Sequence, residues 1–197
     1  MFSSNLVVRT ILRVARFLDT DTKVHAIQAL HCLAEVPTSG RAFIRGGVVQ
    51  FLKDEGLDFQ RRDPRATRQM CMFMSFACLN GEVAEACAEQ ELVPTLVYLL
   101  THPEDSVQLD VLKVMVSMAK HPPAQGGLVK GALVKLVELL ECDHKDKRNL
   151  AALAIGFVIC RLDAQRLVAK HCRPSIYRDL LCSPYLVPST FLSLQNP

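Results

Sequence analysis

Apolar residues recur along the chain in helical segments that repeat about every 40 residues. When the longest helical segment of each repeat is aligned, one apolar position recurs at steps of 44, 41 and 40 residues: Leu30, Met74, Met115 and Ile155. A position in the preceding helix recurs at steps of 40, 45, 40 and 40 residues: Ile11, Phe51, Leu96, Leu136 and Ile176. Units of about this length, built from two or three helices, bury their apolar faces against neighbouring units. The pattern therefore predicts one all-α repeat domain.

Two segments, 41–52 and 80–119, resemble armadillo repeats. Such repeats have a short first helix, a Gly-Gly or Val-Pro turn, a second helix and a longer third helix. Gly46 and Gly47 provide permissive backbone at one such turn, and Pro94 suits the first turn of the helix that follows another. The resemblance implies an all-α, right-handed α-solenoid of about four armadillo-like repeats plus an incomplete fifth.

The alignment also predicts how the chain is divided. An armadillo-like repeat domain is expected over residues 1–182 and an extended C-terminal tail over residues 183–197. The units are expected at about 6–39, 40–79, 80–124 and 125–163, with the incomplete fifth at 164–182. The first unit lacks the short first helix.

The tail is uncharged and contains three prolines, which block a helix. Its large apolar side chains are predicted to contact a partner: Tyr185, Leu186, Phe191 and Leu192. Docking on the side of the solenoid itself is the alternative. Further upstream, the helix expected at 147–162 is apolar nearly all round, so residues 167–182 are expected to help cover it.

Composition narrows the class of protein. Half of the 197 residues are hydrophobic, yet no run approaches the roughly 20 apolar residues of a transmembrane helix. A soluble protein is therefore expected. The net charge of +3, spread over a long surface, gives no reason to expect a nucleic-acid partner.

The eight cysteines include no Cys-x-x-Cys pair. Reduced, mostly buried thiols are expected, and with them an intracellular, reducing compartment: cytoplasmic or cytoskeletal, cilia included. Cys142 with His144, and His171 with Cys172, each offer two metal ligands, whereas a structural zinc site needs four. No metal and no cofactor are expected.

The sequence lacks the motifs of common catalytic sites, so a non-catalytic protein is expected. The segment Gly126–Gly131 has the outer glycines of a phosphate-binding loop, but Ala132 stands where lysine should follow. We expect this segment to be a turn between helices.

The resemblance implies that function lies in the concave groove lined by the third helices. Family members that bind extended peptides carry an asparagine two residues after the apolar anchor and tryptophans four residues before that asparagine. This chain has Cys32, Phe76, Ser117 and Phe157 at the first position, and Gln28, Met72, Lys113 and Leu153 at the second. Binding through an asparagine ladder is therefore not expected.

The groove is instead expected to be partly apolar, with Met72, Phe76 and Phe157 beside Lys113 and Ser117. Such a surface suits an amphipathic helix or a folded neighbouring protein better than a polar peptide. In the alternative, the register is off by one residue and both phenylalanines belong to the core.

The first helix has a cationic stripe at Arg9, Arg13 and Arg16. Apolar residues, Val7 and Phe17 among them, fill most of the remaining circumference, which is too wide an apolar arc for packing on one side only. Another protein is therefore expected to cover this end, the alternative being a helix tucked under its own neighbour. Because the segment is also free of acidic residues, an uncleaved mitochondrial targeting helix is a second possibility for the compartment.

Two clusters of charge precede third helices. Asp63 and Pro64 are a plausible N-cap and first helical residue, next to Arg65 and Arg68. Residues 145–148 occupy the matching turn of a later unit. We expect solvated helix starts at both, with a phosphate or an acidic protein surface as the alternative.

These observations favour a non-catalytic protein–protein interaction module, serving as a structural or scaffold subunit of a larger assembly with several protein partners. The alternative is a freestanding adaptor that binds an amphipathic helix or tail in its groove. An enzyme or a nucleic-acid binder would need motifs or charge that the sequence lacks.

Overall fold

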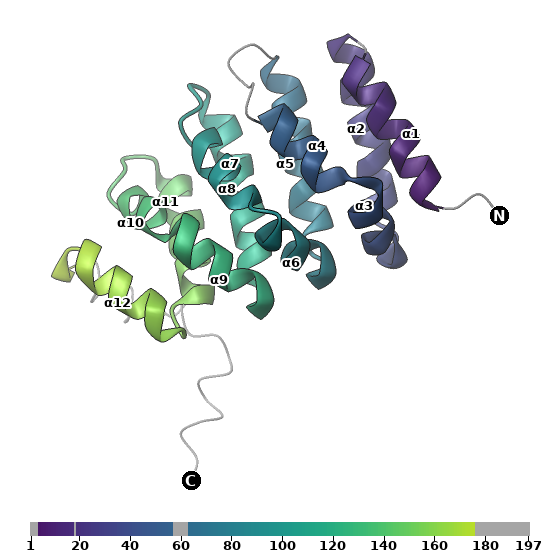
Figure 1. Ribbon diagram of the computed structural model, residues 1–197. Helices are drawn as coiled ribbons and strands as arrows, with labels where there is room; N and C mark the ends of the chain where they lie inside the picture. Colours follow the sequence, from purple (N-terminus) through teal and green to yellow (C-terminus); the bar gives the residue numbers. More distant parts are fainter. Residues whose placement is uncertain (1–3, 18, 57–62, 176–197) are drawn as a thin grey trace.

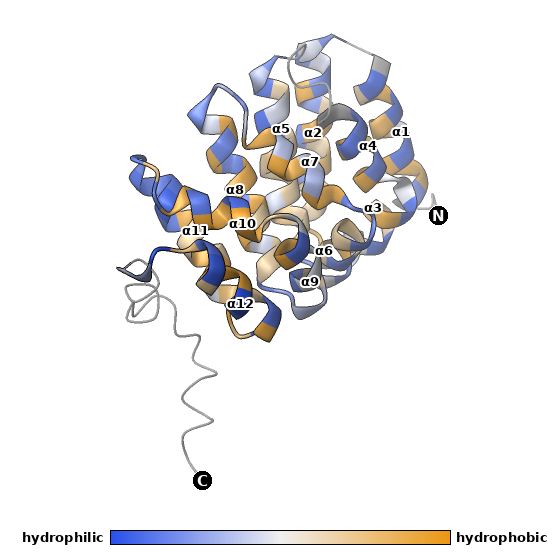
Figure 2. Cartoon of the chain, turned by 60° about the vertical axis from the view of Figure 1, so that its left-hand side comes forward, coloured by the Kyte–Doolittle hydropathy of each residue, from blue (hydrophilic) through white to orange (hydrophobic). Residues whose placement is uncertain are grey.

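The computed structural model describes residues 4–17, 19–56 and 63–175, and in these ranges the regular structure is entirely helical. The helices lie side by side in a curved array that runs from α1 (Ser4–Phe17) to α12 (Leu162–His171), as Figure 1 shows. Apolar and polar residues are interspersed along the helices, as expected for helices with one buried face (Figure 2). The chain is thus an all-α solenoid.

We group the helices into units of neighbouring elements. The first unit contains α1 and α2 (Thr20–Ala34). The second contains the 3-10 turn η1 (Pro37–Ser39), α3 (Gly40–Gly46), α4 (Val48–Gly56) and α5 (Pro64–Ala77). The third contains α6 (Gly81–Glu89), α7 (Leu92–Leu99) and α8 (Asp105–Ala119). The fourth contains α9 (Pro122–Gly131), α10 (Leu133–Leu139) and α11 (Lys145–Val158), and α12 follows it.

Burial confirms the predicted register of the core. All four third-helix anchors are at most 2% exposed: Leu30, Met74, Met115 and Ile155. The second-helix anchors Phe51, Leu96 and Leu136 are buried as well, and Ile11 is half-buried against the core, whereas Ile176 lies outside the described residues. Every unit therefore contributes the same two positions to one continuous apolar core.

Side chains fix where several helices begin. Asp19 accepts hydrogen bonds from the backbone N–H groups of Asp21 and Thr22 at the start of α2, and Asn80 caps α6 in the same way. Asp63 caps α5 with Pro64 directly after it, which confirms the predicted helix start. These bonds satisfy donors that the first turn of a helix leaves unpaired.

Glycines allow neighbouring units to approach closely. Gly46 ends α3 against Val8 of α1, and Gly131 ends α9 against Val93 of α7. A Cβ on Gly131 would lie 2.9 Å from the Val93 Cγ1 atom, which is closer than real Cβ contacts. Gly47 follows with a φ of 86°, a left-handed conformation that favours glycine at the end of a helix.

The segment Gly126–Gly131 is not the predicted turn, because it forms most of α9. Pro122 and Pro123 start this helix, and Gly127 faces α6, where an added Cβ would lie 3.0 Å from the Cβ of Ala88. The glycines thus allow α9 to pack closely on α6. The spacing of glycines in the sequence does not reveal this contact, because it depends on a distant residue.

Another difference concerns the last helix. The predicted cover for the apolar helix α11 was the segment 167–182, of which residues 176–182 lie outside the described residues. The described part belongs to α12, and α12 packs mainly on α10. Within α11 itself, Ala151, Ile155 and Val158 are buried.

The third helices α2, α5, α8 and α11 pack directly on one another and form one layer of the solenoid. In α8, which lies between α5 and α11, nearly all of the second half is buried. The layer of third helices is therefore the spine on which the other helices are arranged.

We predict that Met115→Ala destabilises the fold by about 2 to 5 kcal/mol, because it leaves a cavity in the spine. Met72→Ala makes the same chemical change at a half-buried position two residues before the anchor Met74. It should lower the free energy of unfolding by less than about 1 kcal/mol. Denaturant unfolding followed by circular dichroism measures both. Equal losses would show that the register is wrong.

Burial also predicts the order in which the thiols react. Cys32 and Cys160 are exposed, whereas burial raises the pKa of Cys71 to about 12. Cys78 donates a hydrogen bond to the Cys87 Sγ atom at 3.9 Å, and this bond and burial raise the Cys78 pKa. Since the thiolate is the reactive form, alkylation of the native protein near pH ~8 should modify Cys32 and Cys160 first among the cysteines that the structure describes. Mass spectrometry of the labelled peptides checks this, and equally fast labelling of Cys71 would contradict it.

Candidate functional site

The structure places the residues predicted to line the groove in different environments. Phe76 and Lys113 are exposed and Met72 is half-buried, so these three side chains reach the surface of the spine. Ser117 of α8 is buried, so it does not line a groove. Phe157 is half-buried and packs against the core, so the alternative holds for this phenylalanine but not for Phe76, and the register of the anchors is unchanged.

Charged side chains pair between neighbouring third helices. Arg65 of α5 lies 3.3 Å from Asp21 of α2, measured from its Nη1 atom to Oδ1. The Nε atom of Arg68 donates to the Oδ2 atom of Asp110 in α8 at 3.1 Å. The Nζ atom of Lys147 in α11 donates to the Oδ1 atom of Asp105 at 2.6 Å. We call these three contacts the ion-pair ladder.

The ladder corrects the expectation of solvated helix starts in part, since Arg65, Lys145 and Asp146 are exposed as expected but Lys147 and the carboxylate that binds Arg68 are not. The Lys147 side chain is only 10% exposed, and Arg68 binds a carboxylate whose side chain is 3% exposed. Lys113 also donates to this carboxylate, at 2.7 Å from the Asp110 Oδ1 atom. Two cations thus compensate one buried anion, which is the condition for burying a charge.

The pairing acts on the carboxylate of Asp105 as well. The hydrogen bond from Lys147, followed by its charge, lowers the pKa of Asp105 below its ordinary value. Because these cations already hold carboxylates, the ladder does not present a free cluster for a phosphate. One signal for it was present in the sequence, namely that Asp110 lies directly between the apolar residues Leu109 and Val111 of a third helix.

At the opposite ends of α2 and α5 the surface is apolar. Phe76, Leu79 and Val36 are 44%, 53% and 48% exposed, which is unusual for large apolar side chains so close together. They border a hollow of about 460 Å³ whose wall comes from α2, η1, α3 and α5: Ala34, Glu35, Val36, Ser39, Gly40, Phe43, Phe76, Ala77, Leu79 and Asn80. We call it the apolar hollow. The sequence analysis missed Val36 and Leu79.

Two neighbouring features shape the apolar hollow. The rings of His31 and Phe76 lie 4.4 Å apart at 46°, so His31 supports Phe76 from α2. Beside it, a polar hollow of about 520 Å³ shares Gly40 and Asn80 and contains the Arg41–Glu82 ion pair at 3.1 Å. An apolar centre with a polar rim is the usual organisation of a protein-binding surface.

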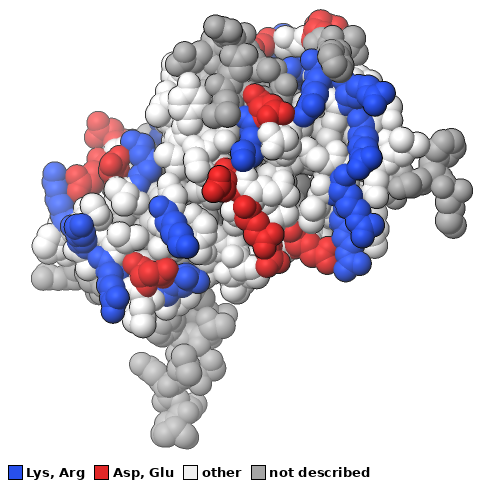
Figure 3. Space-filling view, in the orientation of Figure 1, with Lys and Arg blue, Asp and Glu red and all other residues white. Residues whose placement is uncertain are grey.

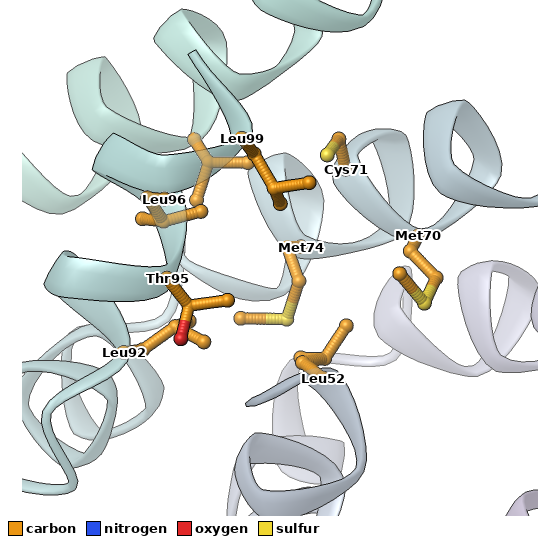
Figure 4. A pocket seen from close by; sticks show the side chains of 9 residues that line it. Leu52, Met70, Cys71, Met74, Leu92, Thr95, Leu96 and Leu99 are labelled. Atoms are coloured by element: carbon orange, nitrogen blue, oxygen red, sulfur yellow. The ribbon is translucent and has the colours of Figure 1, made fainter. Parts of the chain in front are cut away.

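A third space lies inside the solenoid and is too small for a ligand, at about 10 Å³. Side chains of α4 and α5 meet those of α7 and α8 there: Leu52, Met70, Cys71, Met74, Leu92, Thr95, Leu96, Leu99 and Val114. Figure 4 shows how these side chains point toward one another across the boundary between the second and third units. This crevice is therefore a contact between units of the core.

The outer face of α1 is exposed and apolar. Leu6, Val7 and Val14 are 51%, 41% and 38% exposed. Arg9 and Arg13 are exposed on the same helix. Figure 3 shows a column of basic side chains over the N-terminal end of the array. The side chain of Phe17 and the tail residues Tyr185, Leu186, Phe191 and Leu192 lie outside what the structure describes.

Arg9 and Arg16 make contacts with the next unit. The Arg9 Nη2 atom donates to the backbone oxygen of Arg45 at 3.2 Å. Arg16 donates to the Asp54 Oδ2 atom at 3.0 Å and lies over the ring of Phe51. These contacts hold α1 against α3 and α4.

Other chemistry is limited in the part of the chain that is described. No three histidine, cysteine, aspartate or glutamate side chains there lie close enough to hold a metal ion. Likewise, none of the described helices has the length and apolarity needed to cross a membrane.

The comparisons with known proteins concern the fold. No family model and no curated protein matches the chain. A designed armadillo repeat protein is 17% identical with a TM-score of 0.76, over 91% of this chain and 77% of that one. Another, in complex with the peptide (KR)4, is 14% identical with a TM-score of 0.74, over 88% and 79%.

A third similar structure was computationally designed for modular peptide recognition. It is 16% identical with a TM-score of 0.67, over 88% of this chain and 79% of its own. At such low identity the likeness concerns the fold alone. Together with the register of buried anchors, it identifies this chain as a protein with the armadillo-like repeat fold.

Proposed function

We propose that the chain is a non-catalytic protein–protein interaction module that serves as a structural subunit of a larger multiprotein assembly. The armadillo-like fold typically mediates binding of peptides and proteins, which supports the general class. The observation that carries the more specific proposal is the outer face of α1. Val7 and Val14 are exposed there, although the corresponding residues of α7, Leu92 and Leu99, are buried.

The physical argument rests on the cost of exposed apolar surface. Burying such surface contributes about 25 cal/mol per Å², and the terminal units of solenoids normally have a polar outer face. The face of α1 has instead the composition of a surface between units. Interfaces of permanent complexes are likewise more apolar than those of transient ones. A stable subunit therefore fits this face better than a freely diffusing protein.

The proposed compartment is the cytoplasm or the cytoskeleton, cilia included. Mitochondria are the alternative, because α1 is rich in arginine and has no acidic residue. In either compartment α1 would have to stay on the chain, since Val8 and Leu12 belong to the core.

Sedimentation of a gentle native extract tests the proposal. The wild-type chain should migrate with other proteins, far above its own 21.9 kDa, and the double variant Val7→Asp, Val14→Asp should return to monomer mass. Val134→Asp, at an exposed valine of α10, is the matched control and should stay in the assembly. Migration of the wild-type chain as a monomer would contradict the proposal.

A second candidate function is that of a freestanding adaptor that binds an amphipathic helix or tail of another protein. The apolar hollow favours it, because Phe76, Leu79 and Val36 form an exposed apolar patch with a polar rim. Met72 and Lys113 would extend this surface along the spine.

For the adaptor we predict that Phe76→Asp weakens retention of co-purifying proteins at least about tenfold, or roughly 1.4 kcal/mol, without changing helicity or melting temperature. Leu162→Asp changes an even more exposed apolar residue at the far end and should have no effect. Phe157→Asp is unsuitable, because Phe157 packs against the core. Unchanged binding by the Phe76 variant would exclude the apolar hollow as the binding site.

A further inference from the structure

The contact between the second and third units shows how a second helix packs on the unit before it. From α7, Leu92, Thr95, Leu96 and Leu99 line the crevice that faces α4 and α5 (Figure 4). Leu92 and Leu99 are 1% and 3% exposed. This side of α7 is thus completely covered by the preceding unit.

On the same side of α1, no unit of the described residues packs. Aligned on the anchors Ile11 and Leu96, the α1 residues that match the crevice lining lie 85 positions earlier: Val7, Thr10, Ile11 and Val14. They repeat its chemistry, with threonine matching threonine and aliphatic residues matching leucines. Val7, Thr10 and Val14 are nevertheless exposed.

The third helix of the first unit shows the same difference. Ala29 of α2 is exposed, whereas its counterparts in the spine are buried: Phe73, Val114 and Ala154. The uncovered surface therefore extends over both helices of the first unit. We call Val7, Thr10, Val14 and Ala29 the N-terminal stacking face.

The opposite end of the solenoid is closed. Leu52, Met70 and Met74 are the residues through which the second unit receives the third. Their counterparts in the fourth unit, Val137, Ala151 and Ile155, are buried. Within the described residues, these three positions therefore offer a second copy no free surface for head-to-tail stacking.

Charge argues against two copies that meet through their N-terminal stacking faces. Arg9 donates to a backbone carbonyl, and Arg13 makes no ion pair with any described residue. Because α1 contains no acidic residue, two such helices would bring like charges together. An acidic partner would instead complement these two arginines.

We propose that the N-terminal stacking face is covered by an amphipathic helix of another protein, which packs as a preceding unit would and carries acidic residues next to its apolar stripe. This inference rests on the proposed function as a subunit and names the binding mode. The apolar stripe would contact Val7, Thr10, Val14 and Ala29, and the carboxylates would pair with Arg9 and Arg13.

A photo-crosslinking side chain at Thr10, in the full-length chain within its native assembly, tests the position of the partner. Mass spectrometry should identify a crosslinked peptide of another subunit that has apolar residues three and four positions apart and acidic residues beside them. The same probe at Val134 of α10 should not capture that peptide. Crosslinks to a second copy, to lipid or to a peptide without acidic residues would each overturn the proposal.

Charge reversal tests the complementarity. Arg9→Glu with Arg13→Glu should reduce retention in the assembly at least about tenfold, whereas Arg13→Lys should retain it. Lys130→Glu, at an exposed lysine of α9, is the control, and melting curves verify that each variant folds. Full retention of the charge-reversed chain would overturn this inference and leave the proposed function intact. A wild-type chain that sediments alone would overturn both.

Discussion

Burial between neighbouring units is the interaction on which this molecule depends. No unit encloses its own apolar residues, so the anchors Leu30, Met74, Met115 and Ile155 reach almost complete burial only because each third helix packs on the next. Close approach is a condition of this packing, and Gly46 and Gly131 meet it where side chains would collide with the unit before. The curved form of the array and its surfaces follow from this single constraint.

The layer of third helices has charged residues along the edge where these helices begin and apolar residues along part of the edge where they end. Where the third helices begin, the ion-pair ladder uses charge to join adjacent helices, and Asp110 is buried with two cations beside it. Where α2 and α5 end, Phe76, Leu79 and Val36 remain in contact with water. Surface that already has internal partners adds little to recognition, whereas uncompensated apolar surface can gain free energy from a partner. The apolar hollow and the N-terminal stacking face are the surfaces of the second kind.

The sequence predicted the features that depend on a repeated position or on a local capping motif. The anchors could be found because an apolar residue every 40 or so positions stands out without knowledge of its neighbours. The N-cap at Asp63 could be found because a cap and its proline are adjacent in sequence. The fold could be predicted because it, too, follows from positions that repeat along the chain.

Features that depend on the spacing between helices could not be predicted. Asp110 and Arg68 are 42 residues apart, and their pairing requires α5 and α8 to lie side by side. Ser117 and Phe76 occupy equivalent positions on helices that both lie between two other third helices, yet Ser117 is buried and Phe76 is exposed, because the end of α5 borders the apolar hollow. The glycines of α9 led to the prediction of a turn, because the contact with Ala88 that explains one of them cannot be seen in the sequence. Each of these errors concerns a neighbour that is distant in sequence.

The uncovered side of the first unit also links binding to folding. In a solenoid the stability of a unit is the sum of its own stability and that of its interfaces, and α1 and α2 have an interface on one side only. A ligand that binds the folded form alone stabilises it by RT ln(1 + [L]/Kd). A partner bound to Val7 and Val14 would therefore supply an interface on the uncovered side. Its concentration would determine how often the first unit unfolds locally. Cells degrade proteins through such opened states, so the abundance of this chain would follow that of its partner.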